Sequence, residues 1–124
     1  DVARLEGYSI SPNTLNPGDK LDLTLYWRAL APTAVSYTVF TQLLGPDGQL
    51  HGQHDSPPGY GTLTTDRWRP DQLLPDEHPL LIAENAPPGD YQLLVGLYNP
   101  ADGQRVLLAD GSGDYYAIPL RIGP

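Results

Sequence analysis

Side chains that could bind a metal or act in catalysis gather in one short stretch, His51-Gly52-Gln53-His54-Asp55. On a strand, residues three apart and adjacent residues point to opposite faces, so neither the two histidines nor the last His-Asp pair can easily share one ion. His78 stands alone, before a proline. The pattern favours surface histidines beside a loop, and no metal site is expected here.

Residues 110–114, Asp-Gly-Ser-Gly-Asp, alternate oxygen-bearing side chains with glycine, as calcium-binding loops do. An EF-hand loop would also need further ligands and a bidentate glutamate at its end, and the Tyr-Tyr-Ala-Ile that follows supplies none. We expect a flexible Gly/Asp connection. Calcium binding is left open for the case in which a second loop adds carboxylates.

The remaining signals for catalysis are weak. Ser56 follows the histidine stretch, but no Gly-x-Ser-x-Gly elbow is present and two prolines come directly after it. A glycosidase needs a carboxyl whose pKa is raised by apolar burial, and Glu6, Glu77 and Glu84 have no obviously apolar surroundings. The sequence therefore predicts a protein that is not an enzyme and needs no cofactor.

Aromatic residues are the better candidates for binding. If Trp27, Tyr37 and Tyr91 face the core, other rings on the same strands project outward, and flat exposed rings stack on sugars. The candidate ligand-binding residues are Tyr26, Phe40, Tyr60, Trp68, Tyr98 and Tyr115. In the favoured alternative, the loop over residues 56–79 covers Phe40 and Tyr98, and Trp68 plugs an edge of the fold.

These residues lie on a chain that alternates short apolar segments with turns. Residues 20–28 are the clearest strand, because their apolar residues alternate with polar ones: Leu21, Leu23, Leu25 and Trp27 with Asp22, Thr24, Tyr26 and Arg28. Gly-Pro-Asp-Gly and Pro-Ala-Asp-Gly close two hairpins. The expected strands cover residues 2–10, 20–28, 37–44, 49–55, 80–84, 91–98, 105–108 and 115–122, with a long loop over residues 56–79.

Composition supports one all-β domain spanning residues 1–124. Thirteen glycines and fourteen prolines lie between the apolar segments rather than in blocks, which is typical of a turn-rich β protein. The turn at residues 87–90 delivers Tyr91 to the start of a strand, the setting of a tyrosine corner, and Trp27 is placed to fill the space between two sheets. We predict an immunoglobulin-like or fibronectin-like antiparallel β-sandwich of seven to nine strands.

Charge and cysteine content limit the partners. The net charge of −8 repels phosphate backbones and anionic lipid surfaces, so neither nucleic acid nor direct membrane insertion is expected. No apolar run approaches the ~20 residues needed to span a bilayer. With no cysteine, the chain has no disulfides and no thiol nucleophile.

The strand and turn motifs resemble those of one group of bacterial proteins. They include Leu23-Thr24-Leu25-Tyr26-Trp27-Arg28, Trp68-Arg69-Pro70 and Pro88-Gly89-Asp90-Tyr91. The chain resembles the C-terminal β-sandwich domains that follow the membrane-embedded part of protein-mannosyltransferase-like glycosyltransferases. That resemblance implies an extracytoplasmic location, with any membrane anchor outside this segment, and no catalytic residue in this segment.

Together these features predict a non-catalytic extracytoplasmic module with a structural, assembly or spacer role. Its partners would be proteins, either the polypeptide to which it belongs or copies of itself that add strand to strand at exposed sheet edges. The alternative is a carbohydrate-binding accessory module of a glycan-active protein.

Overall fold

The computed structural model describes residues 2–108 and 113–123. Within them the chain forms an all-β sandwich, with two single-turn 3₁₀ helices and no helix long and apolar enough to cross a membrane. The elements are β1 (Ala3–Ser11), β2 (Lys20–Ala29), β3 (Thr38–Leu44), β4 (Leu50–Ser56), η1 (Pro58–Gly61), η2 (Thr65–Arg67), β5 (Leu73–Leu81), β6 (Gly89–Tyr98) and β7 (Tyr116–Ile122).

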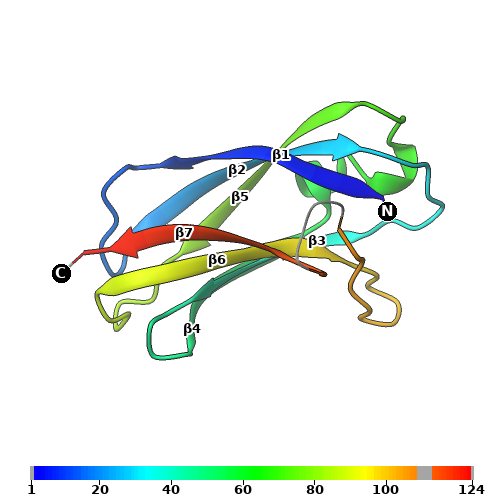
Figure 1. Ribbon diagram of the computed structural model, residues 1–124. Coiled ribbons are helices and arrows are strands. Elements are labelled where there is room, and N and C mark those ends of the chain that lie inside the picture. The colour runs from blue at the N-terminus through cyan, green and yellow to red at the C-terminus, as the bar shows by residue number, and fades with distance from the viewer. Residues whose placement is uncertain (1, 109–112, 124) are drawn as a thin grey trace.

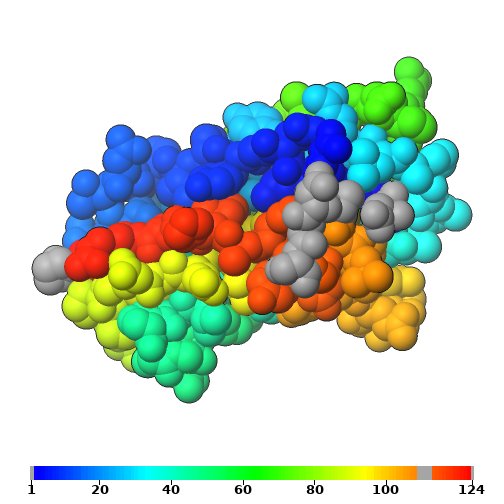
Figure 2. Space-filling view, viewed as in Figure 1, coloured from blue at the N-terminus to red at the C-terminus, as the bar shows by residue number. Residues whose placement is uncertain are grey.

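Two antiparallel sheets pack face to face, one in the order β1-β2-β5 and the other in the order β4-β3-β6-β7 (Figure 1). The predicted antiparallel sandwich is confirmed, with seven strands in the described part of the chain. β1 lies beside β7 along one side (Figure 2), where the Leu5 amide donates to the Tyr116 hydroxyl at 3.4 Å. β5 lies beside β4 along the other side, and the Ala83 amide after β5 donates to the His51 carbonyl of β4 at 2.8 Å.

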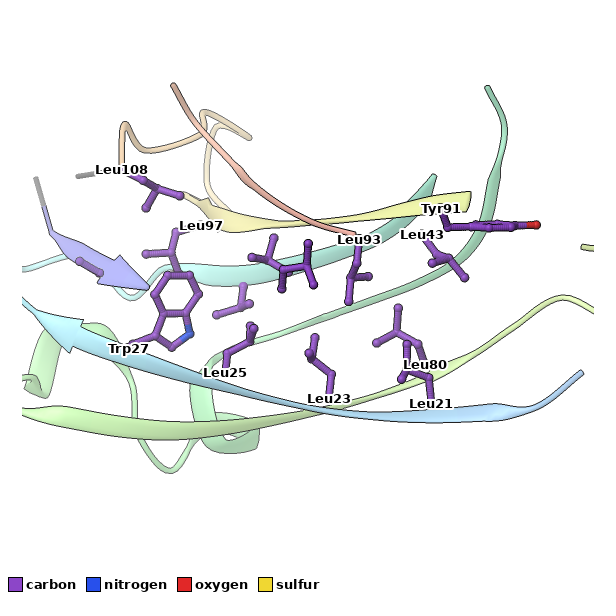
Figure 3. Close-up of a cluster of buried hydrophobic side chains, with 14 of the residues drawn as sticks. Leu21, Leu23, Leu25, Trp27, Leu43, Leu80, Tyr91, Leu93, Leu97 and Leu108 are labelled. Atoms are coloured by element: carbon purple, nitrogen blue, oxygen red, sulfur yellow. The ribbon is translucent and has the colours of Figure 1, made fainter. Parts of the chain in front are cut away.

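The centre of the sandwich is apolar, and the inward residues of β2 form one side of this core. Leu21, Leu23, Leu25 and Trp27 are buried, while the residues between them are exposed or half-buried, as the period of two predicts. Opposite them lie the inward leucines of β3 and β6, including Leu43 and Leu93 (Figure 3). This burial of apolar area is the main source of stability for a domain without disulfides.

The predicted tyrosine corner is present at the start of β6. Tyr91 is almost completely buried, and its hydroxyl donates to the Pro87 carbonyl at 2.5 Å. Burial and the nearby Asp47 carboxylate raise the pKa of this phenol, which keeps it a hydrogen-bond donor. The turn that precedes β6 is therefore tied to the core by one side chain.

The prediction of a loop up to residue 79, followed by a strand at 80–84, was wrong. β5 begins at Leu73 and ends at Leu81, and it pairs with β2 along its whole length. Its inward positions are Leu74, Asp76, His78 and Leu80, so two polar residues conceal the alternation. Its prolines occupy outward positions of an edge strand, where a missing N–H is tolerated.

The predicted strand at residues 105–108 is also not formed. Arg105 makes a single bridge with Tyr98, and the Val106 amide donates to the Leu97 carbonyl at 2.9 Å. β7 already occupies that side of β6 from Gly89 to Val95, so little of the strand is left for a further partner. The Leu108 amide instead donates to the Gly113 carbonyl.

Candidate functional site

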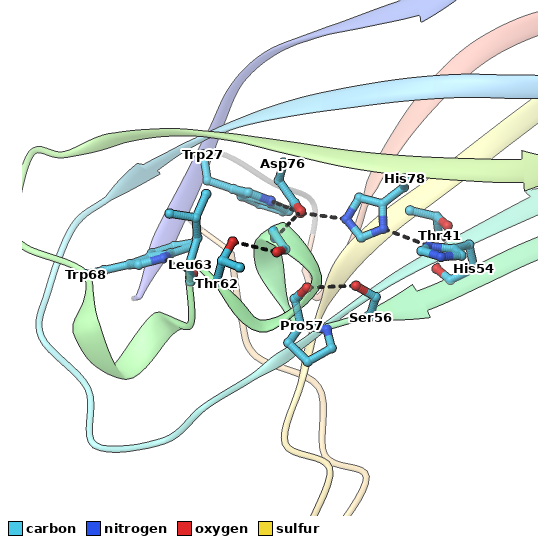
Figure 4. A network of polar contacts seen from close by, with 11 residues as sticks. Trp27, Thr41, His54, Ser56, Pro57, Thr62, Leu63, Trp68, Asp76 and His78 are labelled. Carbon is cyan, nitrogen blue, oxygen red and sulfur yellow. Dashed lines mark hydrogen bonds and ion pairs between the residues drawn. The ribbon is translucent and has the colours of Figure 1, made fainter.

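A polar cluster is buried in the sandwich where β5 faces β4 (Figure 4). Asp76 and His78 have no exposed surface, and Asp76 Oδ2 lies 2.5 Å from His78 Nε2. The same oxygen accepts from Trp27 Nε1 at 3.3 Å, and Oδ1 accepts from the Gly59 amide at 2.9 Å. One carboxylate thus joins β2, β5 and η1, and three donors compensate for its burial.

His54 extends this cluster toward the surface. Its Nδ1 lies 3.0 Å from Nδ1 of His78, and the two rings are nearly perpendicular, at 73°. The Asp76 carboxylate can only accept, so His78 donates from Nε2. Between the two Nδ1 atoms, one nitrogen donates and the other accepts, which couples the protonation of the two rings.

The prediction of surface histidines was wrong for His78, which is wholly buried, and His54 is half-buried. Desolvation and the neighbouring His78 lower the pKa of His54 below its ordinary 6.5, and the carboxylates of Asp55 and Asp76 oppose this shift. His51 lies apart from them and contacts Asp47, with 2.9 Å between Nε2 and Oδ2. Ser56 donates to the Pro57 carbonyl at 2.7 Å.

The cluster supports a turn that carries an exposed aromatic ring. Gly59 and Tyr60 both have left-handed backbone conformations, with φ of 62° and 56°. That region is unfavourable for a bulky residue and is found where surrounding contacts impose it. Here the Asp76 carboxylate binds the Gly59 amide, and the His54 ring lies edge-on to the Tyr60 ring with centroids 6.0 Å apart. Tyr60 remains 58% exposed.

Tyr60 forms one wall of a furrow on the outer face of the β1-β2-β5 sheet. Two adjoining hollows of about 460 and 440 Å³ share Thr24, Tyr60 and Glu77. The first also contains Asp22, and the second contains Tyr26. We call these hollows together the β2–β5 furrow; its other side-chain contributors include Ser11, Lys20, Thr62, Pro75 and Pro79.

Two of the other candidate rings, Phe40 and Tyr98, lie together on the outer face of the second sheet, with centroids 6.4 Å apart. Phe40 lies against Gly96 and under the Arg105 guanidinium, 4.2 Å from its ring centroid, and is only 1% exposed. Tyr98 is half-buried and donates to Asp55 at 3.1 Å. Phe40 is covered as the favoured alternative expected, but by Arg105 of the hairpin after β6 rather than by residues 56–79.

The two remaining candidate aromatics do not line the furrow. Trp68 is 5% exposed, and its indole N–H donates to the Leu63 carbonyl at 2.6 Å. It belongs to the hydrophobic core, in keeping with a plug at the sandwich edge. Tyr115 is half-buried on the segment that leads into β7. The structure therefore brings Tyr26 and Tyr60 together and separates both from the other candidates.

The calcium-like stretch at residues 110–114 falls largely outside the described residues, so its interpretation remains a prediction. Among the residues that the structure does describe, no group of three or more His, Asp or Glu side chains is arranged to hold a metal ion.

Sequence reasoning missed the buried cluster because it assigned residues 73–79 to a loop. A signal was present in the alternation of Leu74, Asp76, His78 and Leu80, which has the period of a strand. On such a strand Asp76 and His78 share one face, with Glu77 on the other. The pattern fits either a strand on the surface or a buried, hydrogen-bonded Asp-His pair. Because β5 pairs with β2, the Asp-His pair is buried.

No protein-family model and no curated protein matches this chain. Among solved structures, it is similar to the Pseudomonas fluorescens alkylpurine DNA glycosylase AlkC bound to DNA, with 11% identity over 98% of this chain and 30% of that chain, and a TM-score of 0.61. It is also similar to AvmM, which catalyses macrocyclization in alchivemycin A biosynthesis, with 12% identity, coverage of 99% and 88%, and a TM-score of 0.51.

A third similar structure is the sporulation control protein Spo0M of Bacillus subtilis, with 10% identity, a TM-score of 0.50, and coverage of 99% of this chain and 49% of that one. The chain thus spans about a third of the AlkC chain and half of the Spo0M chain. At these identities the similarities concern the fold, and proteins of three different roles share it. The comparisons show that the chain has a widely used β-sandwich fold.

Proposed function

We propose that this chain is a non-catalytic extracytoplasmic module that acts as a spacer in a larger polypeptide or assembly. The observation that carries the proposal is that the first and last described residues, Val2 and Gly123, lie at opposite ends of the sandwich (Figure 1). Val2 accepts from the Leu30 amide just beyond the last residue of β2, whereas the Gly123 amide donates to Leu15, before β2 begins. The ends are therefore separated by the length of β2, about 30 Å for ten residues.

Three of the four edge strands, β1, β5 and β7, favour a spacer over assembly by strand addition. β5 carries Pro75 and Pro79, and β7 carries Pro119, each of which removes a backbone donor from an edge strand. β1 has a register shift between Leu5 and Gly7, which interrupts a flat edge. An extracytoplasmic location is the one implied by the resemblance to domains that follow the membrane part of glycosyltransferases.

A tandem series of one, two and three copies would test the spacer role by small-angle X-ray scattering. A spacer predicts monomeric particles whose maximum dimension grows by one sandwich length with each added copy. Compact particles, or self-association of the single copy in sedimentation, would contradict it. Because the chain has no cysteine, Val2→Cys and Gly123→Cys also allow dye labelling at both ends for an independent distance.

Carbohydrate binding is the second candidate function, and the β2–β5 furrow favours it. Tyr60 is 58% exposed at its wall, and Tyr26 contributes a second ring beside polar side chains that can bind hydroxyl groups. An NMR titration of the ¹⁵N-labelled domain with a panel of soluble glycans would test this candidate. Saturable shifts at Thr24, Tyr60 and Glu77 are expected, and shifts scattered over both sheets would argue against a defined site.

A further inference from the structure

We infer that the β2–β5 furrow binds a neutral, linear glycan chain that lies along β2 and stacks on Tyr60. This inference rests on the second candidate function and names the ligand class of the same site. The two hollows adjoin through Thr24, Tyr60 and Glu77, so they form one continuous path. It extends from Lys20 to Tyr26, about 20 Å of strand, which is long enough for several linked sugars.

Tyr60 is a preorganised stacking surface. Its backbone has a left-handed conformation, and the turn is anchored by the hydrogen bond from the Gly59 amide to Asp76. Asp76 is buried and is itself hydrogen-bonded to His78. The His54 ring supports the Tyr60 ring from the β4 side, with centroids 6.0 Å apart, and Tyr60 also lines both hollows. A ring that is already fixed before binding loses little conformational entropy when a sugar stacks on it.

The side chains along the furrow select for uncharged ligands. Glu77 and Asp22 place two carboxylates in it, and Lys20, the one cation among the described lining residues, lies 3.6 Å from Asp22. The furrow is therefore net negative within a chain of net charge −8. Carboxylates accept hydrogen bonds from hydroxyl groups, while uronate, sulfate or phosphate groups on a glycan would be repelled.

The test is isothermal titration at pH 7.5 with neutral β-1,4-linked hexasaccharides of glucose, xylose and N-acetylglucosamine, and with anionic oligogalacturonate. At least one neutral hexasaccharide should bind, and oligogalacturonate should not. Tyr60→Ala should weaken binding at least tenfold, whereas Tyr60→Phe, which retains the ring, should preserve it. Tyr8→Ala removes another exposed tyrosine, on β1 and outside the furrow, and should have no effect.

Glu77→Lys tests whether the negative charge of the furrow excludes anionic glycans. Reversing this charge should allow oligogalacturonate to bind and should lower the affinity for the neutral hexasaccharide. If the unaltered domain binds oligogalacturonate and no neutral sugar, the inference about ligand class is overturned while carbohydrate binding stands. If no glycan binds, or if Tyr60→Ala binds as the unaltered domain does, the furrow is not the proposed site. The spacer role is measured without any glycan and would be unaffected by either result.

Discussion

Two regions of the same buried layer differ in kind. The centre of the sandwich holds leucines, such as Leu23 and Leu93, that point toward each other from the two sheets (Figure 3). The side facing β4 holds Asp76 and His78, which are equally buried but bonded through specific atoms. β5 contributes to both regions, because its inward residues are, in order, Leu74, Asp76, His78 and Leu80.

The difference separates stability from positioning. Apolar contacts are non-directional, so the leucine region stabilises the sandwich without specifying where any one loop lies. The polar cluster has a desolvation cost, which its hydrogen bonds offset only if every group is in place. Among the described residues, no buried side-chain polar atom lacks a partner. In return, Asp76 fixes the turn that presents Tyr60 beside the furrow.

The largest loss of stability is expected for Asp76→Ala. This substitution leaves three buried donors without an acceptor: the His78 ring, the Trp27 indole N–H and the Gly59 amide. Removing one partner of a buried polar network typically lowers the free energy of unfolding by about 3–5 kcal/mol. Urea unfolding followed by Trp fluorescence measures the change. A loss below about 1 kcal/mol would mean that the cluster is hydrated rather than buried.

Leu93→Ala, in the apolar region, should cost about 3 kcal/mol by creating a cavity among residues that are fully buried. It sharpens the comparison because its effect should stay local. Amide chemical shifts of residues 57–63 should be unchanged in Leu93→Ala. If those amides shift as much as the neighbours of Leu93, the two regions are not separable.

Tyr91→Phe should cost about 1 kcal/mol, because it removes one buried hydrogen bond to the Pro87 carbonyl and keeps the ring. The measurement is again the urea midpoint, with an unchanged m-value. A neutral substitution would show that ring packing alone holds the turn before β6.

The smallest expected effect is a pH dependence from His54. Because its pKa is lowered in the folded state, the unfolded chain binds more protons between the ordinary value of 6.5 and the folded value. The contribution of His54 to the free energy of unfolding is therefore fully present above pH 6.5, and it is lost as the pH falls from 6.5 to the folded-state pKa. His54→Gln should flatten the curve there. Equal curves for His54→Gln and the unaltered domain would contradict the assignment.

The sandwich was predictable from sequence because its information is local. The alternation in β2 and the turn before Tyr91 each point to one structure, and both are observed. The polar cluster on β5 was harder to predict. The alternation of residues 74–80 fits a surface strand equally well, and only the pairing with β2 and the hydrogen bond from Trp27 to Asp76 place the two polar residues inside. Of the candidate binding residues, Tyr26 and Tyr60 come together through contacts distant in sequence.

The most direct test of the account is a long-range ¹H–¹⁵N NMR spectrum of the histidine rings at pH 7.5. If the buried Asp76 carboxylate organises the site, His78 must carry a proton on Nε2, and only one of the two facing Nδ1 atoms of His54 and His78 must carry the proton between them. The account predicts those two patterns, and predicts that Asp76→Asn disturbs both. Averaged tautomers at His54 and His78, like those of a free imidazole, would contradict a fixed hydrogen-bonded chain and with it the positioning of Tyr60.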